Sequence, residues 1–559
     1  MSSTFGSFNT VRLGIYAAQK GLDVTGNNIT NINTTGYTRQ RLDQVSLMSS
    51  ATDRYHSTYK VRIGQGAVIT SVSQIRDPSL DISFRKASSD LSETDQWLAG
   101  LEDLASILDE VGKGDGVQDD GVILNQLNDL RDLINKANTN GIQGYDALIK
   151  GSADTLCRLF NSYADKLADL EDKYVTELDQ QVSEVNDILN NLRDINVQIR
   201  NSDIRGDDGL ELRDQRNLLL DELSKYMAID VSYSMEDIGA GQQVEKLTVK
   251  LASQVGHNHT LVDGEYATQI SHGGPAAQDG ETGYAITLGQ LQDKDGAPKV
   301  PWETGDPGNP NGTPPTASTT LVDNDIHGSL QAIRELLTEE GEFSSNNDVV
   351  NVDGEALTKR GIPYYQKALD SLARTFAQAM NDLNNVPDAD KPLVDGDGNL
   401  FSDGSESNVT DNLTAANITI SKDWREGNVS MISSRDPNAP TDDRSNLAAF
   451  LDLFGREHRF DPSEVQPGAA GASYYGTFEE MLLNIQSTLG EDQMSTGVIL
   501  NNYSITYNEI YTDRDSVSGV DLNDEATNLM VYQKAYTAAC RLMTVLEQAL
   551  DSLINGTVV

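Results

Sequence analysis

Residues 8–32 read FNTVRLGIYAAQKGLDVTGNNITNI, and one face of this stretch carries an unbroken row of apolar or small side chains. These side chains recur in alternating steps of three and four residues, which is the heptad spacing of a coiled coil. The stretch also holds three glycines, each of which weakens a helix by roughly 1 kcal/mol. We therefore expect a helix that needs a partner. The row consists of Phe8, Val11, Ile15, Ala18, Leu22, Thr25, Ile29 and Ile32.

The C-terminal end of the chain repeats this pattern over residues 529–553, LMVYQKAYTAACRLMTVLEQALDSL. Asp521, Asn523 or Asp524 is expected to cap the start of this helix. A row this narrow is typical of a coiled coil and not of a helix that lies on a large core. Two interpretations remain open: the rows pair inside an ordinary helical bundle, or they form an assembly surface that is buried only among neighbouring subunits. The second row consists of Leu529, Tyr532, Tyr536, Ala539, Met543, Leu546, Leu550 and Leu553.

The chain between these ends changes its hydrophobic period several times. Gly36 should end the first helix in a turn with positive φ. Pro-rich and Gly-rich loops separate the later segments. The fold class expected is mainly α with β-rich inserts (α+β). Helices are expected over residues 91–111, 123–134, 156–199, 210–226, from 328, 364–383, 446–454 and from 477 to the end, and strands near 61–72, 229–233, 247–251 and 417–420.

This order of segments predicts a nested multi-domain chain, in which the first and last residues share one domain. Residues 1–35 and 524–559 would form terminal coiled-coil helices that serve assembly. A helical-bundle rod domain would combine residues 36–226, 328–390 and 440–523. A β-rich outer domain would occupy residues 227–327, and a small insert of loop and strand residues 391–439.

Composition excludes several classes of partner. The chain has 559 residues, with 86 acidic and 42 basic side chains and a net charge of −44. Nucleic acid needs clustered Lys and Arg, so no nucleic-acid partner is expected, and an anionic membrane surface is excluded for the same reason. No apolar run reaches the length of a membrane span. The N-terminus lacks the pattern of a cleavable secretory signal.

Residues with the chemistry of a metal or redox site do not form a recognised pattern. His257, His259 and His272 lack a completing ligand at zinc-site spacing. Asp395, Asp397, Asn399 and Glu406 fit positions of a calcium loop, but Leu400 stands where the loop needs glycine. Cys157 and Cys540 are expected to be small buried thiols. Motifs for phosphate binding, zinc proteolysis and serine nucleophiles are missing, so we expect no enzyme, no metal and no cofactor.

Three stretches resemble the family of flagellar rod, hook and hook-associated proteins. Residues 26–40, GNNITNINTTGYTRQ, are similar to the N-terminal signature of that family. Residues 66–85 are similar to a strand-to-helix stretch of the hook-associated members, and residues 518–536, SGVDLNDEATNLMVYQKAY, to their C-terminal helix. Within the family, the Arg39-Gln40 ending favours members that form the junction between hook and filament. The strong similarity covers roughly the first hundred and last eighty residues.

The resemblance implies a structural protein of the bacterial flagellum that forms a junction ring and enables flagellin to polymerise. It implies secretion by the flagellar type III apparatus, self-assembly, and contact with the hook protein and with hook-associated protein 3. An export chaperone would bind the C-terminal segment. The alternatives are a hook or distal-rod subunit, and a secreted enzyme or binding module carried by the β-rich insert. The predicted assembly residues, named here the terminal seam, are Val11, Ile15, Leu22, Ile29, Leu529, Tyr532, Tyr536, Met543, Leu546 and Leu550.

Overall fold

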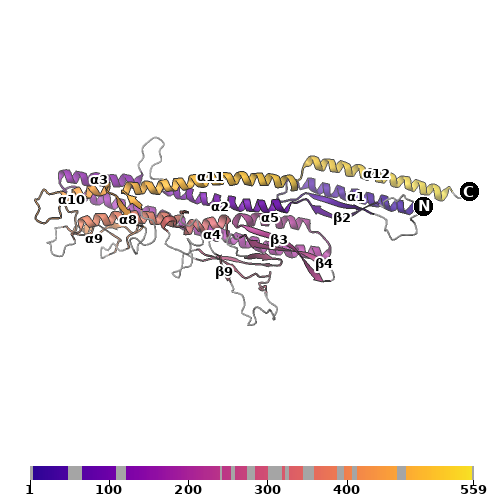
Figure 1. The fold of residues 1–559 in the computed structure, drawn as a ribbon, viewed down its shortest axis with the longest axis horizontal. Coiled ribbons are helices and arrows are strands. Elements are labelled where there is room, and N and C mark those ends of the chain that lie inside the picture. The colour runs from indigo at the N-terminus through magenta and orange to yellow at the C-terminus, as the bar shows by residue number, and fades with distance from the viewer. Residues whose placement is uncertain are drawn as a thin grey trace, which may run out of the picture.

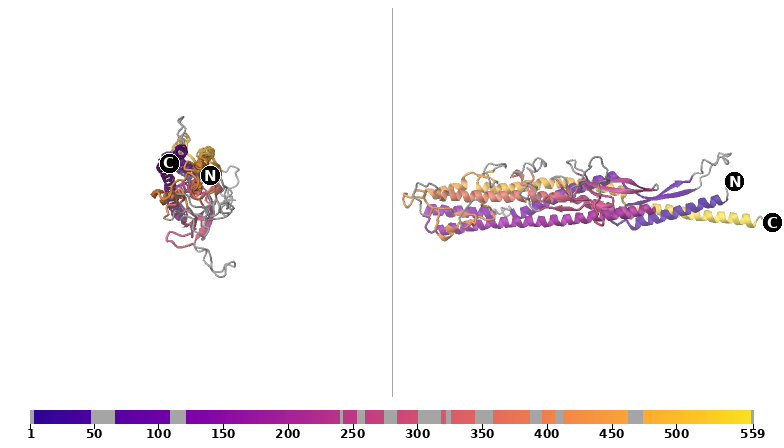
Figure 2. Two further views of the ribbon diagram at one scale, coloured as in Figure 1. Left: turned by 90° about the vertical axis from the view of Figure 1, so that its left-hand side faces the viewer. Right: turned by 90° about the horizontal axis from the view of Figure 1, so that it is seen from below.

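The protein is long and narrow, with helices along its length and both chain ends at the same extremity (Figure 1). Viewed end-on, its elements gather into one compact cross-section (Figure 2). A computed structural model describes residues 4–47, 66–108, 121–239, 242–252, 259–273, 284–299, 318–321, 326–343, 358–386, 396–405, 412–461 and 474–556.

The N-terminal helix α1 (Thr4–Thr30) leads into a β-hairpin that folds back beside it. Gly36 lies in the turn with φ of 78°, as predicted. Strands β1 (Gln40–Ser46) and β2 (Ala67–Gln74) pair antiparallel, with an irregularity between Asp43 and Gln44. The strand expected near residue 68 is thereby confirmed, whereas Val61 and Ile63 lie outside the described residues.

Four helices build much of the long body. Helix α2 (Pro78–Leu108) begins well before the predicted residue 91, because proline is well suited to the first helical position, where its missing N–H costs nothing. It packs against α5 (Leu210–Tyr226), while α3 (Val122–Asn140) packs against α4 (Asp146–Arg205). Helix α4 has 60 residues and is therefore about 90 Å long. It is the long violet helix seen from below in Figure 2.

Two small antiparallel sheets follow α5 and pack against α4. The first two strands have 11 and 10 residues, and the other five have four or fewer. Their buried apolar side chains belong to the same core as those of the helices. The first has the order β3-β4-β5-β6 and the second β7-β8-β9. Their strands are β3 (Ile229–Gly239), β4 (Gln242–Leu251), β5 (Thr260–Asp263), β6 (Tyr266–Ala267), β7 (Ile270–His272), β8 (Ile286–Gly289) and β9 (Ser318–Thr320).

The chain then returns to the helical body, where residues 328–338 pack against α2 and α5, and α8, α9 and α10 lie at the end opposite the termini (Figure 1). Aromatic side chains such as Phe376, Phe401 and Phe478 meet edge to face there. The elements are α6 (Gly328–Thr338), η2 (Gly341–Phe343), α8 (Ile362–Asn384), β10 (Phe401–Ser402), β11 (Thr419–Ile420), α9 (Lys422–Glu426), α10 (Ser445–Gly455), β12 (His458–Phe460) and β13 (Tyr474–Gly476).

The C-terminal helical region is two helices, which agrees with the helical segments expected from residue 477 to the end and with the separate helix start expected near Asp521. Helix α11 (Phe478–Ser518) starts with a capping box between Thr477 and Glu480. Helix α12 (Leu522–Asn555) starts afresh because the Asp521 carboxylate accepts hydrogen bonds from the backbone N–H groups of Asn523 and Asp524, as an N-cap should. Asp521 is thus the cap among the three candidates.

One contiguous hydrophobic core runs through the body and includes the buried row of α4 (Leu170, Tyr174, Leu178 and Val182). The mainly helical fold with antiparallel β inserts is confirmed. In the part of the chain that the structure describes, no helix combines the length and apolarity that a membrane crossing requires.

Candidate assembly interface

Helices α1 and α12 run antiparallel, side by side, at the extremity that carries both chain ends (Figure 1). They approach closely at Gly21, where the Tyr532 ring lies so near that an added Cβ would be 2.5 Å from its carbon atoms. Only glycine admits the ring at this distance. Gly14, one heptad earlier, has no atom within 4 Å of such a Cβ. The two glycines therefore have different structural roles.

The terminal seam is only partly covered in the single chain. Val11 is 6% exposed, and Tyr536 is 37% exposed. On α12, Glu525 is the one buried side chain among the described residues, and no apolar one is buried. A single partner helix thus leaves much of the apolar surface of α12 in contact with water. The half-buried members of the seam are Ile15, Leu22, Ile29, Leu529, Tyr532, Met543, Leu546 and Leu550.

A buried ion pair joins the two ends of the chain at the base of this helix pair. Arg39 Nε donates to Glu525 Oε1 at 2.8 Å, and the Glu525 side chain is 2% exposed. Arg39 also donates its backbone N–H to the carbonyl oxygen of Ser518 at 2.9 Å. Together these bonds hold β1 to the point where α11 ends and α12 begins.

Asn28 fixes the return of the chain from α1 to β1. Its Nδ2 donates to the Gln40 carbonyl oxygen at 2.9 Å, and its Oδ1 accepts the Gln40 backbone N–H at 3.0 Å. The Tyr37 hydroxyl donates to the same Oδ1 at 2.8 Å. A side-chain amide is the group that both donates and accepts in this way. This explains in physical terms an asparagine of the N-terminal signature.

A network of arginines and aspartates connects this base to the long body. Arg514 of α11 donates to Asp81 at 2.8 Å and also reaches Asp221 of α5, while Arg85 donates to Asp221 at 2.9 Å. Burial of Asp81 disfavours its charge, but the hydrogen bond and charge of Arg76, together with Arg514, lower the pKa of Asp81 below its usual value. The network therefore contributes stability as long as its carboxylates are ionised.

A cavity of about 480 Å³ lies beside this network, where the hairpin, α5 and the first sheet meet. Its arginines are paired with carboxylates: Arg216 with Glu245 at 2.6 Å, and Arg213 with Asp203 at 3.0 Å. Arg216 also lies over the Tyr233 ring, 5.0 Å from its centroid. These pairs hold α5 to β4 and to the end of α4.

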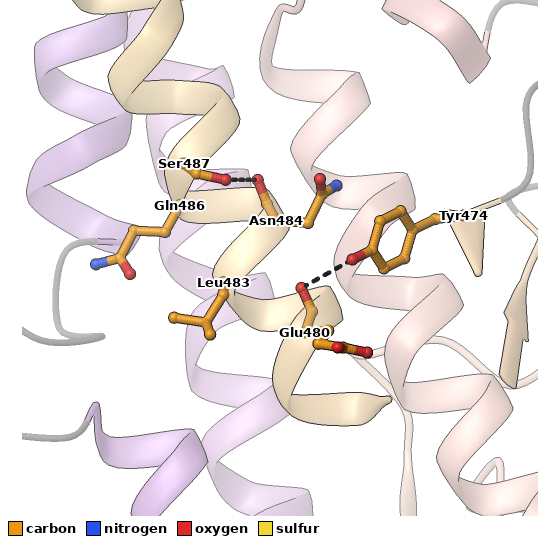
Figure 3. Close-up of a pocket in the computed structure, with 6 residues that line it drawn as sticks. All are labelled: Tyr474, Glu480, Leu483, Asn484, Gln486 and Ser487. Carbon is orange, nitrogen blue, oxygen red and sulfur yellow. Dashed lines mark hydrogen bonds between the residues drawn. The ribbon is translucent and has the colours of Figure 1, made fainter. Parts of the chain in front are cut away.

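A second hollow, of about 470 Å³, is shallow and lies on the outward side of α11 at its start. The Tyr474 hydroxyl donates to the Glu480 carbonyl oxygen at 3.4 Å, and the hydroxyl of Ser487 donates to the carbonyl oxygen of Asn484 at 3.2 Å (Figure 3). Leu483 also lines this hollow and is 47% exposed. The polar groups that line the hollow cap the start of α11 or hydrogen-bond to nearby backbone carbonyl oxygens.

The histidines and carboxylates that resemble metal ligands, but for which no site is predicted, make structural contacts where the structure describes them. His272 Nε2 lies 2.6 Å from Asp179 Oδ1 and links β7 to α4. His257 lies outside the described residues, as do Asp395 and Glu406 of the calcium-loop pattern. Of that pattern, Asp397 accepts the Val386 backbone N–H at 2.9 Å. No group of three or more metal-ligating side chains is found among the described residues.

The two cysteines differ in their surroundings. Cys157 is buried, as predicted, and its burial raises the pKa of the thiol. Cys540 is only half-buried, so the prediction of burial is wrong there. The reason is that α12 has a single helix, α1, packed along it.

Sequence reasoning missed the residues that hold the base of the helix pair. Arg39 and Asn28 lie within the signature, but their partners cannot be found by spacing, because Arg39 and Glu525 are 486 positions apart. Gly21 lies at a close contact and Gly14, one heptad earlier, does not, so the glycine spacing alone does not identify where the two helices meet.

Three parts of the chain match known protein families. The family described as "Flagellar hook-associated protein FlgK helical domain" matches residues 123–387. "Flagella basal body rod protein" matches residues 10–38, and "Flagellar basal body rod FlgEFG protein C-terminal" matches residues 514–556. The terminal matches contain α12 and most of α1.

Two proteins that are similar to this chain over almost their whole length share one name. Flagellar hook-associated protein 1 of Bacillus subtilis (strain 168) is 26% identical over all of this chain and 99% of its own length. The protein of the same name from Salmonella typhimurium is 22% identical over 98% of this chain and 99% of its own. Among solved structures, the flagellar hook junction protein FlgK of Burkholderia pseudomallei has a TM-score of 0.40 and 17% identity, covering 58% of this chain and 47% of that one.

Proposed function

The chain belongs to the family of flagellar hook-associated protein 1, structural components of the hook–filament junction of the bacterial flagellum, and from this premise we propose that its terminal helix pair is the surface through which copies assemble. The terminal seam residues of α1 and α12 are the side chains that would carry this contact. The match to the helical domain over residues 123–387 favours the junction over the alternative of a hook or distal-rod subunit.

The observation that carries the proposal is the incomplete burial of α12. Among its described residues no apolar side chain is buried. Leu542, Val545 and Leu553 are each at least 50% exposed. Fully burying such a side chain contributes about 1.5–3 kcal/mol. An ordinary bundle would already bury these side chains within one chain, so the exposed apolar surface favours assembly among subunits.

The partners follow from the same surface and from the family. Copies of the chain would form a ring, with the hook protein on one side and hook-associated protein 3 on the other. The chain would reach this place by flagellar type III export as a secreted protein. A chaperone that covers α12 before export would keep its exposed apolar side chains from premature association.

The nested division of the chain supports this arrangement. The terminal pair, residues 1–35 and 524–559, would line the ring. The rod domain would consist of residues 36–226, 328–390 and 440–523, and the inserts, residues 227–327 and 391–439, would face outward. In Figure 1 the strands β3, β4 and β9 lie to one side of the long helices, as an outer insert would. The acidic surface of the chain would then be solvated.

Replacing Leu22 and Ile29 with Asp tests the proposal in cells that carry the variant as their only copy. Assembly of flagella should fall at least tenfold, and unpolymerised flagellin should accumulate in the medium, while the thermal midpoint of the long body stays unchanged. Leu148→Asp on α4 is the matched control, because Leu148 is an apolar side chain that is 55% exposed. Normal motility of the double variant would sink the proposal.

Removing residues 529–559 tests the C-terminal half. The truncated chain should neither enter the flagellum nor bind its export chaperone, and its body should remain folded. If it loses the fold of the body as well, the interpretation as an ordinary bundle gains support instead.

A further inference from the structure

Residues 493–508 of α11, QMSTGVILNNYSITYN, contain no Lys, Arg, Asp or Glu, although 23% of the residues in the chain are charged. Asp492 and Glu509 flank this uncharged segment on either side. A helix that is buried on all sides normally lacks charged residues over such a length. A helix with one side in water normally carries charged side chains on that side, so this segment requires an explanation.

Much of this segment is in water. Met494 is 75% exposed, Val498 60% and Ile505 52%. At 100° per residue these three positions fall within about 40° of one another around the helix. We name these three side chains the α11 stripe. Scattered exposed apolar residues are normal on a surface, but an aligned row without charges is typical of an interaction site.

The opposite side of α11 is already occupied. Helix α2 packs along it, and Gln493 Nε2 donates to the Leu101 carbonyl oxygen at 3.0 Å. Thr496 is 8% exposed on that covered side. Figure 1 shows α11 running along the edge of the molecule, above α2. Within one chain, therefore, the stripe faces outward.

We infer that the α11 stripe is a contact surface for a second copy of this chain, an inference that rests on the proposed assembly function. The argument for this occupant is electrostatic. Each copy carries a net charge of −44, and like-charged surfaces that are brought together destabilise a contact. A copy can approach at low cost only through a face without charges. A basic partner would instead favour the acidic surface elsewhere on the chain.

Continuity of the chain supports the same occupant. Helix α11 leads through Gly519–Asp521 directly into α12, whose exposed apolar side chains would contact neighbouring copies in the ring. A neighbour held at α12 is thereby placed close to α11. In a ring the contact is heterologous, so the stripe of one copy meets a different face of the next.

The size of the stripe determines when it acts. A 16-residue helical segment is about 24 Å long, and one of its faces is far smaller than the roughly 800 Å² per partner that a stable complex buries. The stripe alone cannot hold a dimer together in dilute solution. It contributes once the terminal helices raise the effective concentration of the neighbour.

Site-specific cross-linking in the assembled flagellum tests the inference. A photo-reactive amino acid replaces Val498 in the full chain, and another preparation carries it at Leu148 as the matched exposed control. Illumination should yield a product of twice the mass of the chain, with the cross-link traced to a peptide of this same sequence, at position 498 and not at 148. A cross-link to a different protein, or none in assembled flagella, overturns the inference.

Charge insertion provides the functional readout. Val498→Glu with Ile505→Glu should lower the number of assembled flagella at least tenfold without changing the thermal midpoint of the monomer, because both side chains are exposed. Val498→Leu with Ile505→Leu should assemble normally. If the Leu22 and Ile29 variant fails to assemble while the double Glu variant assembles as well as the natural chain, this inference is wrong and the proposed function stands. If the terminal variant assembles normally, the proposed function itself fails.

Discussion

Arg39 donates to the carboxylate of Glu525 at 2.8 Å although the two residues are 486 positions apart, and the Glu525 side chain is 2% exposed. The pair therefore joins the segment that follows α1 to the first turn of α12. Arg39 also reaches Asp524 at 3.4 Å, but the Asp524 side chain is 64% exposed. These two carboxylates give a matched comparison of a buried and an exposed partner.

We predict that Arg39→Ala destabilises the terminal helix pair by about 3 kcal/mol, because removing one partner leaves a buried charge unpaired. Hydrogen exchange of the α1 and α12 backbone amides is the measurement, and both helices should lose protection together. Asp524→Asn should cost less than about 1 kcal/mol, as exposed pairs do. Equal effects of the two variants would contradict the assignment of Glu525 as the buried partner.

Gly21 and Gly14 provide a second comparison. A Cβ at Gly21 would overlap the Tyr532 ring, whereas a Cβ at Gly14 meets nothing within 4 Å. We expect Gly21→Ala to cost about 1–3 kcal/mol by overpacking, and Gly14→Ala to stabilise the helix by up to about 1 kcal/mol. Circular dichroism at 222 nm during thermal unfolding compares the variants. Stabilisation by both alanines would show that the ring of Tyr532 is free to move away.

Asn28→Ala should loosen the return from α1 to β1. The variant leaves the Gln40 backbone N–H and carbonyl without their partner, and each buried unsatisfied group costs about 1–3 kcal/mol. The loss should appear as faster hydrogen exchange in β1 and β2. Thr30→Ala is the control, since the Thr30 hydroxyl bonds only to local helix carbonyls, those of Gly26 and Asn27. Unchanged exchange in the Asn28 variant would show that the hairpin is held by its strand pairing alone.

Glu335 of α6 should make stability depend on pH. It is fully buried, and this burial raises its pKa to about 7, which the charge of Lys359, 2.7 Å from Oε1, only partly offsets. The raised pKa means that the folded state favours the protonated form. Its stabilising contribution is complete below the unfolded pKa of 4.5 and is lost as the pH rises through about 7.

Glu335→Gln should therefore remove this dependence. Relative to the variant, the natural chain should lose roughly 3 kcal/mol of unfolding free energy between pH 4 and pH 8, measured by urea unfolding at both values. Glu340→Gln is the control, because Glu340 is a partly exposed carboxylate paired with Lys367 at 2.7 Å. Parallel pH profiles of the natural chain and the Glu335 variant would contradict the assignment.

Local patterns in the sequence predicted much of the fold. The periodicity of residues 210–226 matches α5 at both ends, and Gly36 and Asp521 mark a turn and a helix cap because their conformational and hydrogen-bonding preferences act within a few residues. The prediction was wrong at the start of α2, which lies at Pro78 and not at residue 91. It was also wrong for the burial of Cys540, because burial there depends on how many helices pack along α12.

The sequence by itself determined that both ends of this chain are helices with a narrow apolar face, because a heptad period fixes which side chains share one side of a helix. Only the tertiary structure decided that α1 lies against α12, that the Tyr532 ring covers Gly21, and that Arg39 pairs with Glu525. The physical reason is that periodicity specifies a face but not its partner. Contacts across hundreds of residues depend on the packing of the whole chain.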